Sequence, residues 1–513
     1  MKGLLPLKES HLHQIMEREG TKFPSQTYKD IVLQPAFDNA KKQFIKPMIE
    51  IHLAHLIMLV EEGIIQKAEA VEIVKAIKKI DVNEIEKVPY DPSFEDLFFQ
   101  IEHFLIEEAG EIAGNLHIAR SRNDMGIAIY RITLRQKLLK LIEIATKFRD
   151  SLIALTDEYI DTIMIGYTHT QQAQPTTLAH YFNAMTDLLT RDITRFHAAY
   201  ERLNRSTMGA AALTTSGFPV NRKRMQELLG FEGMIDNSWD AVAGADYIGE
   251  IASVIQLAAI NLGRSIQDFL LWGTQEFGAI KLSAPYVQIS SIMPQKRNPV
   301  SIEHMRALLS SVAGNAQTVL TMMHNTPFGD IVDTEDDMQP YMWKAIEALQ
   351  NNYQLLSSVL LTMEVDKEKL LKRAKESFAN VTELADTLVR TNHLSFRKAH
   401  EIVSATVRDL SAQKKESIQD FTLSLLNKHA EKIIGRKLNL TEEEFIQALS
   451  PEHFVKIRTV EGGPSRERME KTIKERHEEQ KLLEKWLDEK YATLKKAHEL
   501  VENIVTEWTK ANG

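Results

Sequence analysis

The amino-acid sequence predicts an all-α protein, and three observations support this fold class. Glycine and proline are scarce, with 22 and 15 among 513 residues, so most segments contain few residues that interrupt a helix. The alternation of apolar and polar residues that is typical of β-strands is nearly absent. Long windows instead repeat apolar residues at helical spacing, as in the two stripes formed by Met48, Ile49, Leu53, Leu56 and Ile57 and by Ile302, Met305, Leu308, Leu309 and Val312.

The longest periodic stretches run from about residue 140 to 205 and from 247 to 275. We expect them to form long bundle helices, which usually need partner chains when apolar residues lie on more than one side. Boundaries near Gly110–Gly114 and residues 365–375 predict an N-terminal helical domain (1–114), a central long-helix bundle (115–368) and a C-terminal helical domain (369–513). From about residue 465, a charge-dense pattern predicts an extended amphipathic helix that packs on its own domain or on a neighbour.

The composition argues against several classes of protein. The chain carries 62 Lys and Arg against 71 Asp and Glu, a formal charge of −9 with both signs interspersed, which disfavours a nucleic-acid-binding protein. The absence of cysteine excludes disulfides and thiolate metal sites and favours a cytoplasmic location. No apolar run approaches ~18–20 residues and the N-terminus lacks an apolar signal core, so no membrane association is expected. Neither HExxH nor GxGxxG after a strand is found, so no metal or organic cofactor is indicated.

The stretch Ile289–Pro299 (ISSIMPQKRNP) combines two hydroxyls, an ammonium and a carboxamide on a segment that two prolines interrupt. Asn298-Pro299 predicts a helix start, with asparagine as the N-cap and proline as the first helical residue. Ser290 and Lys296 would then lie on an ordered loop leading into a helix, where side chains can converge on an anion.

A second segment, His117–Asp124 (HIARSRND), contains groups that suit carboxylates. Ser121, Arg122 and Asn123 offer a hydroxyl, a guanidinium and a carboxamide in succession. Charged residues at a helix start are common, so this segment alone does not establish a binding site.

A third segment, Gly166–Pro175 (GYTHTQQAQP), contains a candidate acid–base group. His169 lies between two threonines, Thr168 among them, and is followed by glutamines that include Gln171. Alternatively, His169 is a structural histidine. Glu303 could be a buried carboxylate that orients this imidazole, or a first-turn glutamate that favours the helix dipole.

Together these motifs resemble the argininosuccinate lyase family of the fumarase/aspartase superfamily. SSIMPQKRNP is close to the superfamily's SSxMPxKxNP, HIARSRND is similar to HTxRSRND, and THTQQAQP is similar to THLQRAQP. The resemblance spans roughly residues 45 to 475. It implies three mostly helical domains, whose central helices form a twenty-helix core in a homotetramer with active sites shared between three chains. It also implies β-elimination of a C–N bond in a small-molecule substrate, with release of fumarate.

The resemblance implies a role for each polar group. Ser290 would remove the proton, and His169, oriented by Glu303, would assist protonation of the leaving nitrogen. Lys296 would stabilise the negative charge that builds on the substrate carboxylate. The succinyl carboxylates would be bound by Ser121, Arg122, Asn123, Thr168, Lys296 and Asn298, and Gln171, Asp330 and Glu335 would complete the substrate-binding set.

The sequence departs from the family at several positions, and some of these lie where the leaving amine would bind. Phe98 occupies a histidine position, and Ile289 a glycine position of the catalytic loop. The family's YNKDLQEDKE aligns with residues 330–339 (DIVDTEDDMQ), so a tyrosine, a glutamine and a lysine become Asp330, Glu335 and Met338. A pocket for a carboxylate has thus lost a cation and gained acids, which would repel a carboxylate on the amine.

The sequence leaves three interpretations of function open. Family resemblance alone suggests cleavage of argininosuccinate to arginine and fumarate. The acidic segment favours a different, more cationic amine, and it disfavours an aminopolycarboxylic acid. The third interpretation is a non-catalytic helical relative, but such a scaffold has no physical need to keep Ser290, Lys296, Asn298, His169 and Glu303 together.

Overall fold

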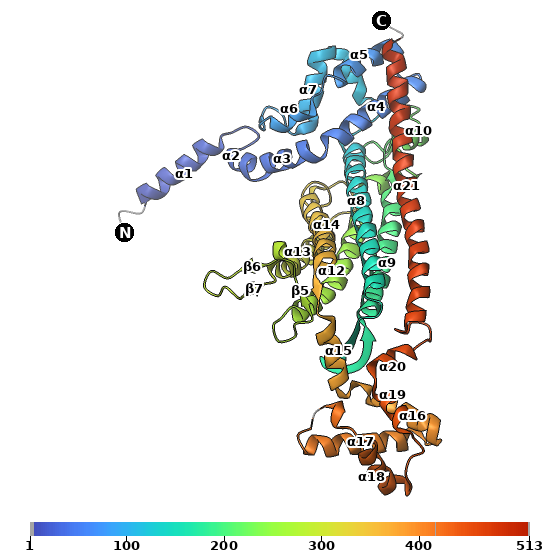
Figure 1. Cartoon of the computed structure of the whole chain (residues 1–513). Helices are drawn as coiled ribbons and strands as arrows, with labels where there is room; N and C mark the ends of the chain where they lie inside the picture. The colour runs from blue at the N-terminus through green and yellow to red at the C-terminus, as the bar shows by residue number, and fades with distance from the viewer. Residues whose placement is uncertain (1–4, 416, 511–513) are drawn as a thin grey trace.

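The computed structural model describes residues 5–415 and 417–510, and helices make up most of it (Figure 1). The prediction of an all-α fold is confirmed. One large apolar core runs through an elongated central bundle, because its long helices turn aliphatic and aromatic side chains toward one another. These helices are α8 (Arg122–Glu158), α9 (Leu178–Leu203), α12 (Asp246–Trp272), α13 (Val300–Met323) and α14 (Gln339–Thr362).

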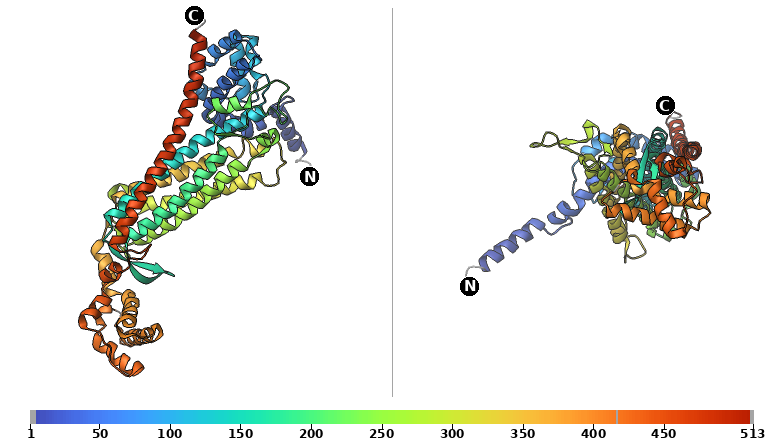
Figure 2. Two further views of the ribbon diagram at one scale, coloured as in Figure 1. Left: turned by 90° about the vertical axis from the view of Figure 1, so that its right-hand side faces the viewer. Right: turned by 60° about the horizontal axis from the view of Figure 1, so that its bottom comes forward.

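Smaller helices lie at the two ends of the bundle (Figures 1 and 2). The N-terminal group comprises α1 (Leu5–Glu19), α2 (Gln26–Tyr28), η1 (Lys29–Leu33), α3 (Gln34–Gln43), α4 (Ile45–Glu61), α5 (Lys67–Ile77), α6 (Val82–Lys87), α7 (Leu97–Ala109) and η2 (Glu111–His117). The opposite end carries α15 (Lys367–Glu376), η5 (Phe378–Asn380), α16 (Val381–Asn392), α17 (Phe396–Ala412), η6 (Ile418–Asp420), α18 (Leu423–Ile434), α19 (Glu442–Leu449) and α20 (Pro451–Lys456). Short connecting helices are α10 (Arg222–Leu228), α11 (Ser238–Ala243), η3 (Ala284–Tyr286) and η4 (Val332–Thr334). Among the helices described, none alone is long and apolar enough to span a membrane, and only the bent pair 26–43 and 45–61 passes on length and composition.

The strands in the described residues pair two by two. The antiparallel pairs are β1 (Ile163–Thr168) with β2 (Gln171–Thr177), β5 (Ile280–Lys281) with β8 (Glu364–Val365), and β6 (Gln288–Ile289) with β7 (Arg297–Asn298). The parallel pair is β3 (Arg205–Ser206) with β4 (Gly233–Met234). Two of these pairs, β1–β2 and β6–β7, carry motifs that the sequence singled out.

The expected run of helix from about residue 140 to 205 is interrupted, and in this part the prediction was wrong. Helix α8 ends at Glu158, and the β1–β2 hairpin separates it from α9. The hairpin contains Pro175, which cannot continue a helix interior, and β-branched residues such as Ile163 and Ile165. The segment containing His169 is therefore a hairpin and not part of a helix.

The predicted helix start at Asn298-Pro299 was also wrong, by one residue. Asn298 belongs to β7, where it pairs with Gln288, and helix α13 begins at Val300 with Pro299 preceding it. Strand pairing holds the Asn298 backbone extended, and no side chain caps this helix.

The terminal helix α21 (Arg466–Lys510) lies along the bundle and does not stay with the helices that precede it (Figure 2). It packs against α8 and then reaches α4, α5 and α10 in the N-terminal group. Val501, Val505 and Trp508 are buried there, which explains the apolar stripe within its charged sequence. The domain boundaries at residues 114 and 368 stay a prediction. Helix α21 nevertheless connects the two ends of the bundle.

A buried arginine of α8 joins this helix to the bundle. The Arg149 side chain is fully buried, and its Nε donates to the Thr190 hydroxyl of α9 at 2.7 Å. Its two terminal nitrogens lie 2.7 Å from a Glu479 carboxylate oxygen and 2.9 Å from Gln480 Oε1, both of α21. A buried guanidinium needs such partners because an unpaired buried charge is costly.

Replacing Arg149 with methionine is expected to lower the free energy of unfolding by about 3 kcal/mol, because Gln480 Oε1 would lose a buried donor. Urea denaturation at one fixed protein concentration measures this loss. The control is Lys481→Met, which removes an exposed ion pair between Lys481 and Glu478 of α21 (2.9 Å). This change should lower the free energy of unfolding by less than about 1 kcal/mol. Equal losses in both variants would contradict the anchoring role of Arg149.

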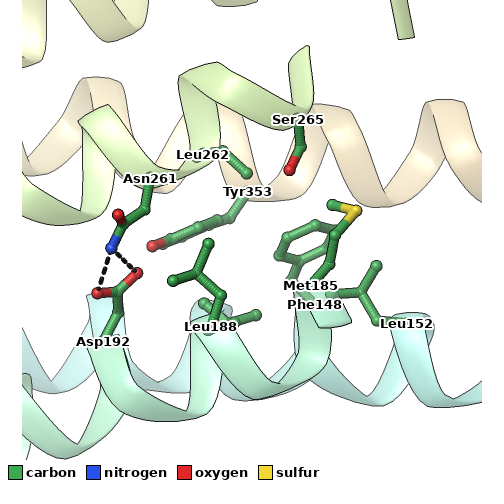
Figure 3. A pocket seen from close by; sticks show the side chains of 10 residues that line it. Phe148, Leu152, Met185, Leu188, Asp192, Asn261, Leu262, Ser265 and Tyr353 are labelled. Carbon is green, nitrogen blue, oxygen red and sulfur yellow. Dashed lines mark hydrogen bonds between the residues drawn. The ribbon is translucent and has the colours of Figure 1, made fainter. Parts of the chain in front are cut away.

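The bundle also encloses a small cavity between α8, α9, α12 and α14 (Figure 3). Its volume is about 20 Å³ and its walls are mostly apolar, so it has room for about one water molecule. At its edge Asn261 Nδ2 donates to both oxygens of Asp192, at 3.0 and 3.3 Å (Figure 3). This cavity is too small for a substrate, so the functional site lies elsewhere.

Candidate active site

A cavity of about 360 Å³ lies where the N-terminal helices meet the start of α8. Helix α3 supplies an apolar wall that includes Phe37 and Ala40. The other walls come from residues 95–98, from the first two turns of α8, and from the segment 330–337. Four predicted site residues line this one cavity, namely Arg122, Asn123, Asp330 and Glu335.

The start of α8 presents Arg122 and Asn123 to this cavity. Ser121 is the N-cap, and its hydroxyl accepts from the Asn123 backbone N–H at 3.3 Å and donates to the Asn123 carboxamide oxygen at 2.9 Å. The Arg122 guanidinium lies 2.8 Å from Asp96 Oδ2. An anion here would meet a guanidinium, a carboxamide and the positive end of a helix of 37 residues.

Asp124 fixes this helix start to a neighbouring loop. Its carboxylate is fully buried and accepts backbone N–H groups from Ser121 at 3.0 Å and from Gly209 and Ala211 at 2.9 Å. Burial raises the pKa of Asp124 to about 6 against these three donors. The sequence interpretation missed this role, although Asp124 is the last residue of the quoted HIARSRND motif.

The segment 330–337 makes the floor of the cavity acidic. Asp330, Glu335, Asp336 and Asp337 all line it. Burial raises the pKa of Glu335, and the neighbouring Asp330 carboxyl raises it further. Asp336 Oδ1 accepts the hydroxyl of Tyr130, a residue of α8, at 2.6 Å. The sequence interpretation missed Tyr130 and Asp336, which are 206 positions apart.

Ser290 and Lys296 lie in the loop of the β6–β7 hairpin, which projects from the bundle (Figure 1). The Ser290 hydroxyl accepts the backbone N–H groups of Ile292 and Met293, at 3.3 and 3.1 Å. Ile292 is 85% exposed, so within this chain the loop tip has no cover. A cavity of about 450 Å³ at the base of the hairpin is lined by none of the predicted site residues.

The burial expected for Glu303 is not found within one chain, and its pairing with His169 stays a prediction. Glu303 is exposed in the first turn of α13, because Ile302 and Met305 take the inward positions of that turn. Over residues 11–415 and 417–510, the Glu303 side chain forms no ion pair or hydrogen bond within the chain. The alternative that the sequence left open, a first-turn glutamate at a helix N-terminus, describes its position.

Thr168, His169 and Gln171 form the exposed tip of the β1–β2 hairpin. His169 and Thr170 have φ of 51° and 62°, the positive values that a two-residue turn of type I′ requires. The hairpin lies at the end of the bundle opposite the start of α8 (Figure 1). One chain therefore holds the predicted residues in three separate groups: the cavity, the β6–β7 hairpin with Glu303, and the β1–β2 tip.

The chemistry of these groups is that of a site for an anionic substrate with proton transfer. Arg122 and Asn123 can bind carboxylates, Lys296 can stabilise negative charge, and Ser290 and His169 can exchange protons. The described residues contain no cluster of three or more His, Asp or Glu side chains that could hold a metal ion.

Comparisons with known proteins agree with this chemistry. The family model described as Lyase matches residues 39–314, and the model described as Argininosuccinate lyase C-terminal matches residues 378–456. Argininosuccinate lyase 2 of Agrobacterium fabrum is 42% identical over 455 residues, covering 88% of this chain and 90% of the relative. Argininosuccinate lyase of Methanococcus maripaludis is 37% identical over 459 residues, covering 89% and 94%.

Solved structures support the same relationship. An EDDS lyase variant with bound fumarate superposes with a TM-score of 0.85 at 30% identity, covering 97% of this chain and 98% of that one. A class II fumarase from Schistosoma mansoni shares the fold, with a TM-score of 0.65 at 17% identity over 80% of this chain and 90% of that one. The chain therefore belongs to the argininosuccinate lyase family within the fumarase/aspartase superfamily, and it is a carbon–nitrogen lyase that releases fumarate.

Proposed function

We propose that this lyase acts on an N-substituted aspartate whose amine portion ends in a positive charge and carries no carboxylate there. The observation that carries the proposal is the acidic floor of the cavity that Arg122 and Asn123 also line. The aspartate portion suits the guanidinium and carboxamide, while Asp330 and Asp336 suit a cation. A carboxylate on the amine would meet these acids without a compensating charge.

Cleavage of argininosuccinate is the second candidate, because relatives at 36–42% identity carry that name. Arginine, however, bears an α-carboxylate on the part that leaves. Amines with further carboxylates meet the same repulsion, and both classes are therefore expected to be poor substrates.

In the proposed reaction Ser290 removes the proton from the carbon next to one carboxylate. The C–H electrons form the double bond of fumarate, the C–N pair leaves with the nitrogen, and His169 assists protonation of that nitrogen. Lys296 and Asn298 stabilise the charge that builds on the carboxylate, and Ser121 and Thr168 add hydrogen bonds to it. Gln171 lies beside Thr168 across the hairpin and completes the set.

We further propose a homotetramer in which each active site takes residues from three copies. The separation of the three groups within one chain supports this arrangement, and so does the exposure of both hairpins. Exposed apolar side chains on α12, α13 and α14 are suited to contacts between copies: Leu257, Ile260, Leu271, Leu308 and Leu361. We place the enzyme in the cytoplasm because none of its 513 residues is cysteine.

The test is the addition of fumarate to matched amines, and the loss of fumarate absorbance measures the rate. Putrescine carries the distal cation, ornithine adds a carboxylate to the same chain, and butylamine removes the cation. Agmatine and arginine form a second pair that differs only in the carboxylate. We expect kcat/KM for putrescine and agmatine to exceed that of each partner about a hundredfold.

Equal rates with arginine and agmatine would show that the acidic segment does not select the amine. If no amine adds to fumarate and no amine adduct releases fumarate, the result would favour the non-catalytic relative. The panel therefore separates the three interpretations.

A further inference from the structure

The hydroxyl of Tyr130 connects α8 to the acidic floor of the cavity. We propose that Tyr130 is a positioning residue that holds Asp336 as the carboxylate for the distal ammonium of an alkyl diamine portion. This inference rests on the proposed function and goes further, because it assigns the recognition of the cation to one carboxylate among several.

Tyr130 is well placed to fix another side chain. It lies on the same face of α8 as Asn123 and Gly126, two turns beyond Asn123. The residue is 6% exposed. Its ring packs edge-on against Phe44 of the α3–α4 junction, with ring centroids 5.3 Å apart. The helix and this packing hold the hydroxyl in one position, from which it donates to Asp336 Oδ1 at 2.6 Å.

The charges of the cavity walls favour a cation as ligand. Six carboxyl groups line the cavity (Glu95, Asp96, Asp330, Glu335, Asp336 and Asp337), against one guanidinium and no lysine. That guanidinium, Arg122, already pairs with Asp96 at 2.8 Å and with Glu95 at 3.4 Å. Within the described part of the chain no lysine, arginine or histidine forms an ion pair with the four acids of segment 330–337. Within the described residues of one chain, these four carboxyl groups are therefore not neutralised by an ion pair.

Asp336 differs from its neighbours in having a dedicated neutral donor. The Tyr130 hydrogen bond favours its ionised form, against burial and against repulsion by Asp96 and Asp337, which together raise its pKa. Glu335 lies beside Asp330, and burial and this second carboxyl raise its pKa, so its neutral form is favoured. A distal ammonium therefore finds at Asp336 a carboxyl group that Tyr130 holds in one orientation.

An apolar wall of the cavity suits the hydrocarbon body of such an amine. Val32, Leu33, Ala36, Phe37 and Ala40 of η1 and α3 face the same cavity. An alkyl chain can pack against these side chains while its terminal ammonium reaches Asp336. An amine with carboxylates along its chain fits neither surface.

The inference is tested by the kinetics of Tyr130→Phe with putrescine and butylamine as the amines added to fumarate. We expect KM for putrescine to rise about tenfold while kcat changes less than about twofold, since the lost bond orients a binding group. The parameters for butylamine should stay unchanged. Asp336→Asn should give the same selective rise in KM, and the double variant should not exceed Asp336→Asn alone.

The matched control is Tyr181→Phe, which removes the same kind of bond, a tyrosine hydroxyl donated to Asp268 at 2.7 Å, from a half-buried position between α9 and α12. Its preference for putrescine over butylamine should equal that of the parent protein. Equal losses for putrescine and butylamine in Tyr130→Phe would assign Tyr130 a merely structural role and overturn the inference, as would an unchanged KM. If Tyr130→Phe does not fold, Asp336→Asn decides by the same comparison.

Failure of the proposed function gives a different result. In that case the parent protein shows no preference for putrescine over ornithine and butylamine. If the parent protein has that preference and both Tyr130→Phe and Asp336→Asn retain it, only the inference about these two residues fails.

Discussion

Replacing Ser290 with alanine is expected to lower kcat by about a hundred- to ten-thousand-fold, the usual contribution of a positioned acid–base group. The loss should fall on kcat more than on KM, because the hydroxyl acts on the proton and not on the carboxylates. Fumarate release from the best substrate of the amine panel measures the effect. Folding should be preserved, since Ser290 lies in an exposed hairpin loop and its hydroxyl bonds to backbone N–H groups of that loop.

The matched control is Ser310→Ala, which removes an exposed serine hydroxyl of α13 that donates only to a backbone oxygen of its own helix. Its kcat should equal that of the parent protein. A Ser290→Ala variant with normal kcat would assign the proton to another group. If both variants and the parent protein share the same biological activity without any lyase activity, a scaffold role would be favoured.

Mixing two inactive variants is expected to restore activity. In the proposed tetramer Ser290 and Arg122 enter one site from different copies, so Ser290→Ala and Arg122→Met can complement each other. At equal amounts and random assembly, about a quarter of the sites contain neither substitution, because each contributing copy is the suitable variant half of the time. The variants are dissociated in mild denaturant, mixed and reassembled, and fumarate release is measured.

The control mixture pairs Ser290→Ala with Lys296→Met. Both residues lie in the same β6–β7 hairpin, so every site receives one of the two substitutions and the mixture should stay inactive. Tagged copies show whether the two variants have co-assembled. If they have and the first mixture still recovers no activity, the shared site would be refuted.

Helical periodicity predicted the bundle because its signal is local and repeats over many turns. The β1–β2 hairpin was missed because Ile163 and Ile165 alternate over too few residues to stand out between two long helices. Asn298 was misplaced for a different reason: its backbone conformation depends on pairing with Gln288, and Asn-Pro alone gives no sign of that partner. Strand pairing within the hairpin therefore overrode the preference of the Asn-Pro pair.

The candidate site was predictable where residues follow one another in a motif. Ser121, Arg122 and Asn123 were found in this way, and alignment with the family identified the acidic segment that now lines the same cavity. The bond between Tyr130 and Asp336 has no counterpart in any local pattern, because it joins helix α8 to the turn before α14, and only the fold brings the two together. The exposed position of Glu303 likewise follows from the packing of Ile302 and Met305 and not from its sequence neighbours.

The path of α21 has a consequence for the time at which the N-terminal helices reach their final packing. Its last turns bury Val501, Val505 and Trp508 against helices formed by residues 45–77, and the Lys67 ammonium lies 5.9 Å from the centre of the Trp508 ring. Those early helices leave the ribosome first but meet this surface only after residues 501–508 have been made. The N-terminal group therefore reaches its final packing only once α21 has been made, and until then it leaves apolar surface for chaperones to cover.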